Sequence, residues 1–326
     1  MTNKQRYEIF CNERPEIPFF MQAWWLDAVC TPEDKQWDVL LCEENGKIIG
    51  VMSYHLLKKW GLKIIVQPQL TQYTGVWIDY PKDDKLHKRY SLEKQVMDNL
   101  IDQLEKLKVS FYEQNFHYSF TNWQPFYWRG FQQTTRYTYI LKNIVDLEII
   151  YNGIHKKIKQ HIQKGEEEFA VYNQLTPEEF YQFHKSSLQA KKRKIIYSER
   201  IFMSIYQAAI SRNQGKIIAI RDKKNELLSA VFFVWDKDSA YNLIVAKAPL
   251  ENAHFISDYM TWEVIKYVSK KTQNYDFEGS MIEGVARKNQ YFGAEQQPYF
   301  CISKTNSYIF DLLLKLKIRK KEDSKK

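Results

Sequence analysis

The first half of the chain alternates between helical and strand-like hydrophobic spacing. Large apolar side chains recur with helical spacing over Pro18–Val29, and the apolar run that follows at Trp37–Cys42 is typical of a buried strand. The Asn45-Gly46 pair behind that run favours a type I′ turn, which predicts a hairpin. Further strands are predicted at 48–57, 63–68, 69–79, 110–118 and 130–141. A helix is predicted at 87–108, between the strands at 69–79 and 110–118.

The pattern restarts near residue 145. An amphipathic basic helix is predicted at Asp146–Lys164, and Thr176–Glu179 has the residues of a capping box with proline at the first helical position, which opens a helix to Lys192. The remaining predicted elements are a helix at 198–212, a three-strand meander at 216–222, 227–235 and 240–247, a crossover helix at 255–271, a strand at 275–278, and a helix, strand and helix at 283–291, 298–303 and 306–316.

The two halves share one layout. Leu40–Tyr54 and Ala219–Val234 are each a strand, a charged turn and a strand, and they are about 180 residues apart. Such a repeat favours a tandem duplication of one α/β (α+β) module, each with a mixed, largely antiparallel sheet flanked by helices. The predicted divisions are a first module at 1–145, a second at 146–317 and a basic, disordered tail at 318–326.

Composition and charge narrow the class of protein. The chain has 326 residues, 44% hydrophobic and 15% aromatic, and a net charge of +9 that gathers at 156–164, 191–194 and 315–326. This charge favours anionic partners such as RNA, phosphates or an anionic membrane surface, and a solvated basic face is the alternative for each cluster. No apolar run approaches the ~20 residues that span a bilayer, and the first 14 residues are too polar for a signal peptide, so we expect a cytoplasmic protein.

Cysteines and histidines show no metal-ligand spacing. The four cysteines have no C-x-x-C pair, and three of them lie in apolar or strand-like contexts, which is typical of reduced thiols. His155 and His161 are six residues apart and therefore lie on different faces of a helix. No metal is expected.

The chemistry is concentrated at Tyr275–Gly284. Asp276 and Glu278 end a short apolar run just before Gly279 and Ser280, so a buried strand is predicted to deliver two carboxylates to a turn. As residues two apart on a strand they would point to one face, and a close pair would raise one pKa toward neutrality, which suits a general base. Glu278, nearer the turn, is the first choice; a strand exit with a helix cap is the structural alternative.

Other candidate binding residues flank this stretch in both halves. Amides and rings at 67–77 suggest a cleft wall, with a β-bulge as the alternative. Four consecutive basic residues at 191–194 suggest an anion site, and nearby tyrosines and a helix arginine could add donors. The candidate substrate-binding set is Gln67, Gln72, Tyr73, Trp77, Lys191, Arg193, Tyr197, Tyr241, Ser280 and Arg287.

The order of elements resembles the GNAT acyltransferase module, and two such modules in tandem resemble the FemAB family of peptidoglycan-bridge aminoacyltransferases. The stretches that carry this likeness are VQPQLTQYTGVW at Val66–Trp77 and YDFEGSMIEGVARKNQYFGAEQQPYF at Tyr275–Phe300. The resemblance spans nearly the whole chain. It implies transfer of an acyl or aminoacyl group to an amine, with aminoacyl-tRNA as donor and a peptidoglycan precursor at the inner face of the membrane as acceptor.

The donor is the point where the sequence departs from the wider superfamily. GNAT enzymes that use acetyl-CoA hold its pyrophosphate on a glycine-rich loop at a helix N-terminus, but no glycine occurs between Gly215 and Gly279. Acyl-CoA is therefore disfavoured, no cofactor is expected, and a carrier-bound donor such as aminoacyl-tRNA is preferred. Two alternatives stay open: an N-acyltransferase that uses acyl-CoA or acyl carrier protein on another amine, and a non-catalytic module pair that binds RNA or an anionic membrane surface.

Overall fold

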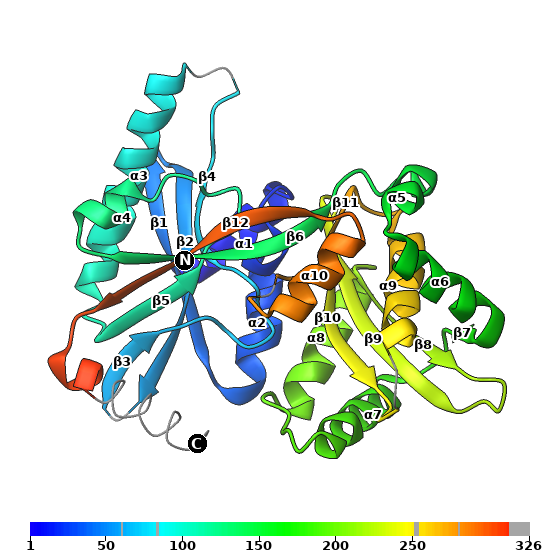
Figure 1. Ribbon diagram of the computed structural model, residues 1–326. Helices are drawn as coiled ribbons and strands as arrows, with labels where there is room; N and C mark the ends of the chain where they lie inside the picture. Colours follow the sequence, from blue (N-terminus) through cyan, green and yellow to red (C-terminus); the bar gives the residue numbers. More distant parts are fainter. Residues whose placement is uncertain (60, 83–84, 251–253, 280, 313–326) are drawn as a thin grey trace. The chain divides into compact units, whose positions relative to one another are not determined.

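A computed structural model of the chain describes residues 1–59, 61–82, 85–250, 254–279 and 281–312 (Figure 1). The chain divides into two compact units. Unit 1 contains residues 1–135 and the returning segment from 299 onward, and unit 2 contains residues 136–298. The predicted tail at 318–326 lies outside the described residues.

Unit 1 is built on an antiparallel hairpin that continues into a mixed sheet. The strands are β1 (Gln36–Glu44), β2 (Lys47–Lys59), β3 (Leu62–Ile65), β4 (Gly75–Ile78) and β5 (Phe111–Asn115). The order is β1-β2-β3-β5, with β3 and β5 parallel and β4 paired to β2. Asn45 and Gly46 have φ values of 50° and 76°, which confirms the predicted hairpin turn.

One long helix covers a face of this sheet. The helices of unit 1 are α1 (Asn3–Glu13), α2 (Ala23–Cys30), α3 (Leu86–Lys106) and α4 (Gln124–Trp128). The buried stripe of α3 includes Val96, Leu100 and Leu104, which pack in one cluster with the strands. A Cβ on Gly50 of β2 would lie 2.2 Å from Val96, so glycine is required for this close approach.

Unit 2 repeats the plan with its own meander. The strands are β6 (Gln132–Leu141), β7 (Ala170–Tyr172), β8 (Gly215–Arg221), β9 (Leu227–Trp235), β10 (Ser239–Lys247) and β11 (Asn274–Asp276). Their order is β6-β11-β10-β9-β8-β7, in which only β10 and β11 are parallel. The predicted three-strand meander is confirmed.

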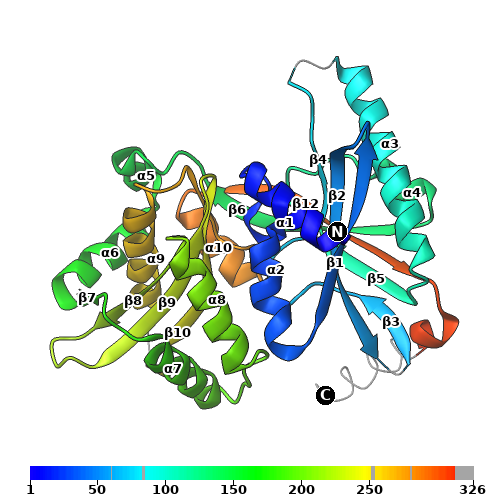
Figure 2. The same ribbon diagram turned by 180° about the vertical axis from the view of Figure 1, so that it is seen from behind.

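Helices cover both faces of the unit 2 sheet. They are α5 (Leu147–Gly153), α6 (Lys156–Glu168), α7 (Pro177–Ala190), α8 (Glu199–Ser211), α9 (His254–Val268) and α10 (Glu283–Tyr291). Phe232 of β9 contacts Phe202 of α8, whereas its neighbour Phe233 contacts Tyr267, just before the end of α9. Because successive strand residues point to opposite faces, α8 and α9 lie on opposite sides of the sheet (Figure 2). The predicted capping box at Thr176 is present.

The two halves of the sequence exchange their last strands. β12 (Glu295–Thr305), the final strand of the second half, pairs antiparallel with β5 of unit 1. β6, the final strand of the first half, pairs antiparallel with β11 of unit 2. Each unit therefore has the same series: an antiparallel meander, a parallel strand after a long crossover helix, and an exchanged antiparallel strand. The compact units thus divide the chain after residues 135 and 298, whereas the repeat in the sequence divides it after 145.

Candidate functional site

The turn after β11 is organised by one buried carboxyl group. Asp276 is 4% exposed, and its Oδ1 accepts hydrogen bonds from the Thr138 hydroxyl on β6 and, at 2.8 Å, from the Glu278 backbone N–H. Burial raises the pKa of Asp276 to about 6, although both hydrogen bonds favour the ionised form. This carboxyl group therefore fixes the turn to β6.

The backbone reverses immediately behind Asp276. Phe277 donates its N–H to Tyr139 O at 2.9 Å, and then Glu278 and Gly279 take left-handed φ values of 61° and 68°. A Cβ on Gly279 would lie 2.5 Å from Tyr137 O, so only glycine fits. A left-handed non-glycine residue such as Glu278 is held by its surroundings, which is a feature of functional turns.

The expectation that both acids project from one face of a strand is wrong. β11 ends at Asp276, and Glu278 lies in the left-handed turn, partly exposed. Asp276 is buried and holds the turn, whereas Glu278 is partly exposed with its Oε1 atom buried. Ser280 lies outside the described residues.

A cluster of positive charge gathers where β10 runs into α9. Lys247, the last residue of β10, is partly buried and makes no ion pair with any residue that the structure describes. Its backbone N–H donates to Ser187 Oγ on α7 at 3.1 Å. Desolvation, together with the nearby charges of Lys288 and Lys191, lowers the pKa of the Lys247 ammonium group to about 8, and the charge of Asp258 acts in the opposite direction.

Asp258 ties three helices together beside Lys247. This carboxylate on α9 is 5% exposed; its Oδ1 accepts from Lys288 Nζ of α10 at 3.0 Å, and its Oδ2 lies 2.7 Å from His161 Nδ1 of α6. The charges of Asp258, Lys288 and Lys191 all act on Lys247. We call these three lysines, His161 and Asp258 the lysine cluster.

The lysine cluster has the charge of an anion site. A partly buried ammonium group without a carboxylate partner is costly, and a bound anion would remove that cost. Asp258, the carboxylate of the cluster, lies in the second turn of α9. A phosphate group is the anion that this combination suits best.

The structure brings some predicted residues of unit 2 to this cluster and places others elsewhere. Lys191 belongs to it, whereas Arg193 is exposed on the loop behind α7 and Arg287 is exposed on α10. Tyr197 and Tyr241 are 8% and 1% exposed, and the Tyr197 hydroxyl lies 3.5 Å from His184 Nδ1 in the core. Both tyrosines therefore pack in the core, and a role for their hydroxyl groups as donors to a substrate stays a prediction.

Sequence reasoning missed Lys247, Asp258 and His161. Asp258 was the detectable signal, because a carboxylate among the buried residues of α9 requires a partner. Lys247 closes an apolar strand and gives no such sign, and His161 lies on a helix with many other charged residues. Their convergence depends on how α6, α9 and β10 pack.

The predicted residues of unit 1 form a packed polar network. Gln67 Oε1 accepts from the Asn115 N–H at 3.1 Å and from the Thr74 hydroxyl at 3.3 Å, while Gln72 O accepts from Asn115 Nδ2 at 3.3 Å. Tyr73 is buried between Phe20 and His117, with ring centroids 5.1 and 4.5 Å away. Trp77 lies apart on β4, edge-on to Phe10 at 5.7 Å.

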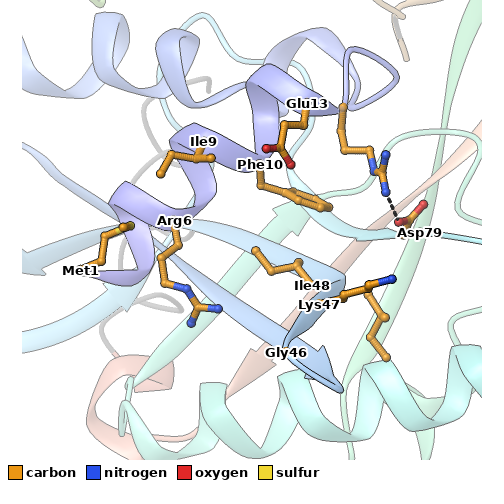
Figure 3. Close-up of a pocket in the computed structure, with 11 residues that line it drawn as sticks. Met1, Arg6, Ile9, Phe10, Glu13, Gly46, Lys47, Ile48 and Asp79 are labelled. Atoms are coloured by element: carbon orange, nitrogen blue, oxygen red, sulfur yellow. Dashed lines mark hydrogen bonds and ion pairs between the residues drawn. The ribbon is translucent and has the colours of Figure 1, made fainter.

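A cavity of about 510 Å³ lies in unit 1 between α1 and the β1–β2 hairpin (Figure 3). Its two arginines are paired locally: Arg14 pairs with Asp79 at 2.9 Å and Arg6 with Glu43 at 2.5 Å. None of the predicted catalytic or binding residues lines it. The cavity therefore does not compete with the unit 2 turn as a reaction site.

Over the described parts of the chain, no three or more His, Cys, Asp or Glu side chains are grouped so that they could hold a metal ion. No described helix is both long and apolar enough to cross a membrane.

Comparison with known proteins shows the fold. No family model and no curated sequence matches the chain. Among solved structures, FemX matches with a TM-score of 0.65 at 13% identity, covering 92% of this chain and 96% of FemX. L-PGS from Bacillus licheniformis matches with a TM-score of 0.57 at 9% identity, covering 95% of each chain. The C-terminal domain of a proposed lysylphosphatidylglycerol synthetase from Agrobacterium fabrum gives 0.54 at 10%, covering 87% of each. The chain therefore shares its fold with FemX and L-PGS.

The Gly279 turn predicts a contrast between two glycines. Gly279→Ala should lower the free energy of unfolding by ~1–3 kcal/mol, because its Cβ would collide with Tyr137 O at a strained φ. Gly284→Ala, on α10 with open space around it, should instead raise it by ~0.5–1 kcal/mol. Urea unfolding of both variants checks this; equal stabilities would contradict the turn geometry.

The raised pKa of Asp276 predicts a pH-dependent effect of Asp276→Asn. An acid whose folded pKa is raised from 3.8 to about 6 stabilises the protein below pH 3.8, and this contribution is lost as pH rises through 6. The amide keeps an acceptor for Thr138 but cannot ionise. The variant should therefore gain stability relative to the natural protein between about pH 4 and pH 7, by on the order of 3 kcal/mol at most. Melting temperatures across this range check it, and a constant difference would contradict it.

Proposed function

We propose that this chain is an acyltransferase that moves an activated acyl or aminoacyl group to an amine of a cell-envelope precursor. The observation that carries the proposal is the lysine cluster at the start of α9, because a GNAT-type fold receives the phosphates of its donor at this position. The fold shared with FemX and L-PGS supports the same class of reaction. The peptidoglycan acceptor rests on the resemblance of 66–77 and 275–300 to FemAB proteins.

The reaction needs few groups from the protein. The amine nitrogen attacks the carbonyl carbon of the donor ester, a C–N bond forms, and the C–O bond to the carrier breaks. A base removes one proton from the attacking nitrogen, and the leaving hydroxyl takes up a proton. Because the ester is already activated, correct placement of both substrates supplies much of the rate and no covalent nucleophile is required.

We assign the base to Glu278 and the positioning role to Asp276. Glu278 is partly exposed in a turn of fixed backbone conformation, so its carboxylate is held in one region. Asp276 is enclosed and already accepts two hydrogen bonds, which suits a group that fixes the turn and not one that contacts substrate.

The donor is assigned by charge. The lysine cluster presents ammonium groups and no glycine occurs between Gly215 and Gly279, so side chains and not a nest of backbone amides would hold a phosphate. Separate lysines suit the spaced phosphates at the 3′ end of a tRNA better than the compact pyrophosphate of acyl-CoA. We therefore propose an aminoacyl-tRNA donor and keep acyl-CoA as the second candidate.

Replacing Glu278 tests the assignment of the base. Glu278→Gln keeps the shape of the side chain and removes its basicity, so transfer should fall by ~10²–10⁴-fold while donor binding is unchanged. The assay follows radiolabelled amino acid from charged tRNA, or acetyl from acetyl-CoA, into a soluble muropeptide precursor. Transfer at the natural rate by this variant would remove Glu278 from the mechanism.

Replacing Lys247 tests the donor site. Lys247→Met should weaken binding of aminoacyl-tRNA by ~10-fold or more, since a charge-assisted contact is worth ~1.5–3 kcal/mol. Lys270→Met, at an exposed position, is the matched control and should change little. In the natural protein the affinity should fall as pH rises through about 8, because Lys247 then loses its proton.

Thermal shift provides the readout for the donor. A ligand at 100 times its Kd adds ~2.7 kcal/mol to the stability of the folded state. A shift with charged tRNA that Lys247→Met reduces supports the proposal, and a shift with acetyl-CoA alone selects the second candidate. The proposal of an enzyme would be overturned if uncharged RNA binds, if Lys247→Met and Lys270→Met weaken this binding equally, and if neither donor supports transfer. That outcome would indicate a non-catalytic RNA-binding protein.

A further inference from the structure

A second cavity of unit 1 lies between the first turns of α3 and the segment that leads into α4. Its volume is about 680 Å³, within the ~300–1,000 Å³ range of ligand pockets. α4 lies beside α3 in both views (Figures 1 and 2). The lining comprises Tyr90, Ser91, Lys94, Thr121, Asn122, Trp123, Gln124, Pro125, Trp128 and Phe300. None of these residues belongs to the turn or to the lysine cluster of unit 2.

Exposed aromatic rings dominate this cavity. Tyr90 is 53% and Trp128 57% exposed, and Trp123 lies edge-on to Tyr127 with ring centroids 5.5 Å apart. Trp123 and Phe300 pack against the core from the inner side of the hollow, whereas the exposed rings of Tyr90 and Trp128 indicate a surface that a ligand covers. The rings offer flat apolar faces of the kind that stack on a ligand.

Polar groups around the rings are available to a ligand. Four side chains of the lining make no side-chain hydrogen bond to the residues that the structure describes. They are the indole N–H groups of Trp123 and Trp128, the side-chain amide of Gln124 and the hydroxyl of Thr121. An amide and a hydroxyl can both donate and accept, and an indole donates. Flat rings beside such neutral groups match a ligand with an apolar face and an edge of hydroxyls.

The wall of the cavity is held in place by a buried carboxylate. Glu93 of α3 is 3% exposed and accepts hydrogen bonds from Asn122 Nδ2 at 2.6 Å, Tyr80 at 3.0 Å and Arg89 at 3.1 Å. Asn122 Oδ1 in turn accepts from the Gln124 N–H at 3.2 Å. The residue before Trp123 is therefore fastened both to α3 and to the start of α4, so this wall of the site is formed before a ligand arrives.

The local charges exclude an anionic ligand. Lys94, the cation of the lining, is paired with Asp98 at 2.5 Å. Arg129, next to Trp128, is paired with Asp102 at 2.5 Å and with Glu105 at 2.7 Å. A nucleic acid or an anionic membrane surface needs unpaired cations at its contact, and these carboxylates would repel both.

We propose that this cavity binds a neutral oligosaccharide. One pyranose ring stacks its C–H face on Trp128 or Trp123, and its hydroxyls exchange hydrogen bonds with Gln124, Thr121 and the indole N–H groups. The site is independent of the proposed transfer reaction, and it gives unit 1 a binding function that none of the predicted residues accounts for.

The test uses titration calorimetry and saturation-transfer NMR on the full chain. The probes are N-acetylglucosamine tetramer and cellotetraose, which present neutral rings with and without acetamido groups. Binding in the millimolar to micromolar range is expected. Trp128→Ala should weaken it by about tenfold, the effect of losing one stacked ring, and Gln124→Ala should weaken it by a smaller factor.

Tyr308→Ala is the matched control, since Tyr308 is 82% exposed outside the cavity and should leave affinity unchanged. Because Trp128 is also exposed, its variant should melt at the natural temperature, which separates lost binding from lost fold. The proposal is overturned if neither saccharide binds saturably, or if Trp128→Ala leaves binding unchanged. It is equally overturned if the natural protein binds oligouridylate or phosphatidylglycerol vesicles and no saccharide, and if Trp128→Ala weakens that binding. Loss of transfer in the Glu278 or Lys247 variants would not affect this result.

Discussion

The hydrogen bonds of the Asp276 carboxyl group are the constraint on which the rest of unit 2 depends. One oxygen accepts both from Thr138, on the strand that the first half of the sequence contributes, and from the backbone of Glu278. The same contact therefore closes the exchange of strands and sets the turn. Without it, neither the left-handed conformation of Glu278 nor the close passage of Gly279 over Tyr137 would be defined.

A second constraint follows from charge. Asp258 of α9 contacts His161 of α6 and forms an ion pair with Lys288 of α10. The pair with Lys288 joins α10, the helix that follows the turn, to the crossover helix α9. Lys247 remains without a carboxylate of its own among the described residues. The turn and the lysine cluster are thus linked through α10: its first residues follow the turn, and its Lys288 reaches the cluster. Unit 2 thus has a turn with a carboxylate, Glu278, and a cluster of lysines. Together they suit a donor that has both an acyl ester and a phosphate.

The value of sequence reasoning differed between elements. Local signals worked well: Asn45-Gly46 predicted the hairpin, the Thr176 capping box predicted the start of α7, and the apolar spacing predicted α10 at Glu283–Tyr291. The candidate site was found in part, because the stretch with Asp276 stands out by composition. The prediction that Asp276 and Glu278 point to one face of a strand was wrong. β11 ends at Asp276, and Glu278 has a left-handed backbone conformation, so the alternation of strand side chains does not reach Glu278.

The class of fold, the two repeated modules and the stretch that carries the carboxylates could all be predicted from the amino-acid sequence. These depend on spacing and turn residues, which act over a few positions. The exchange of β6 and β12 between the two units is seen only in the tertiary structure. Every strand offers the same backbone N–H and C=O groups, so its sequence does not specify which strand it pairs with. The tertiary structure alone also brought Lys247, Asp258 and His161 together. Their neighbourhood is created by packing between elements nearly 100 residues apart, for which no local pattern exists.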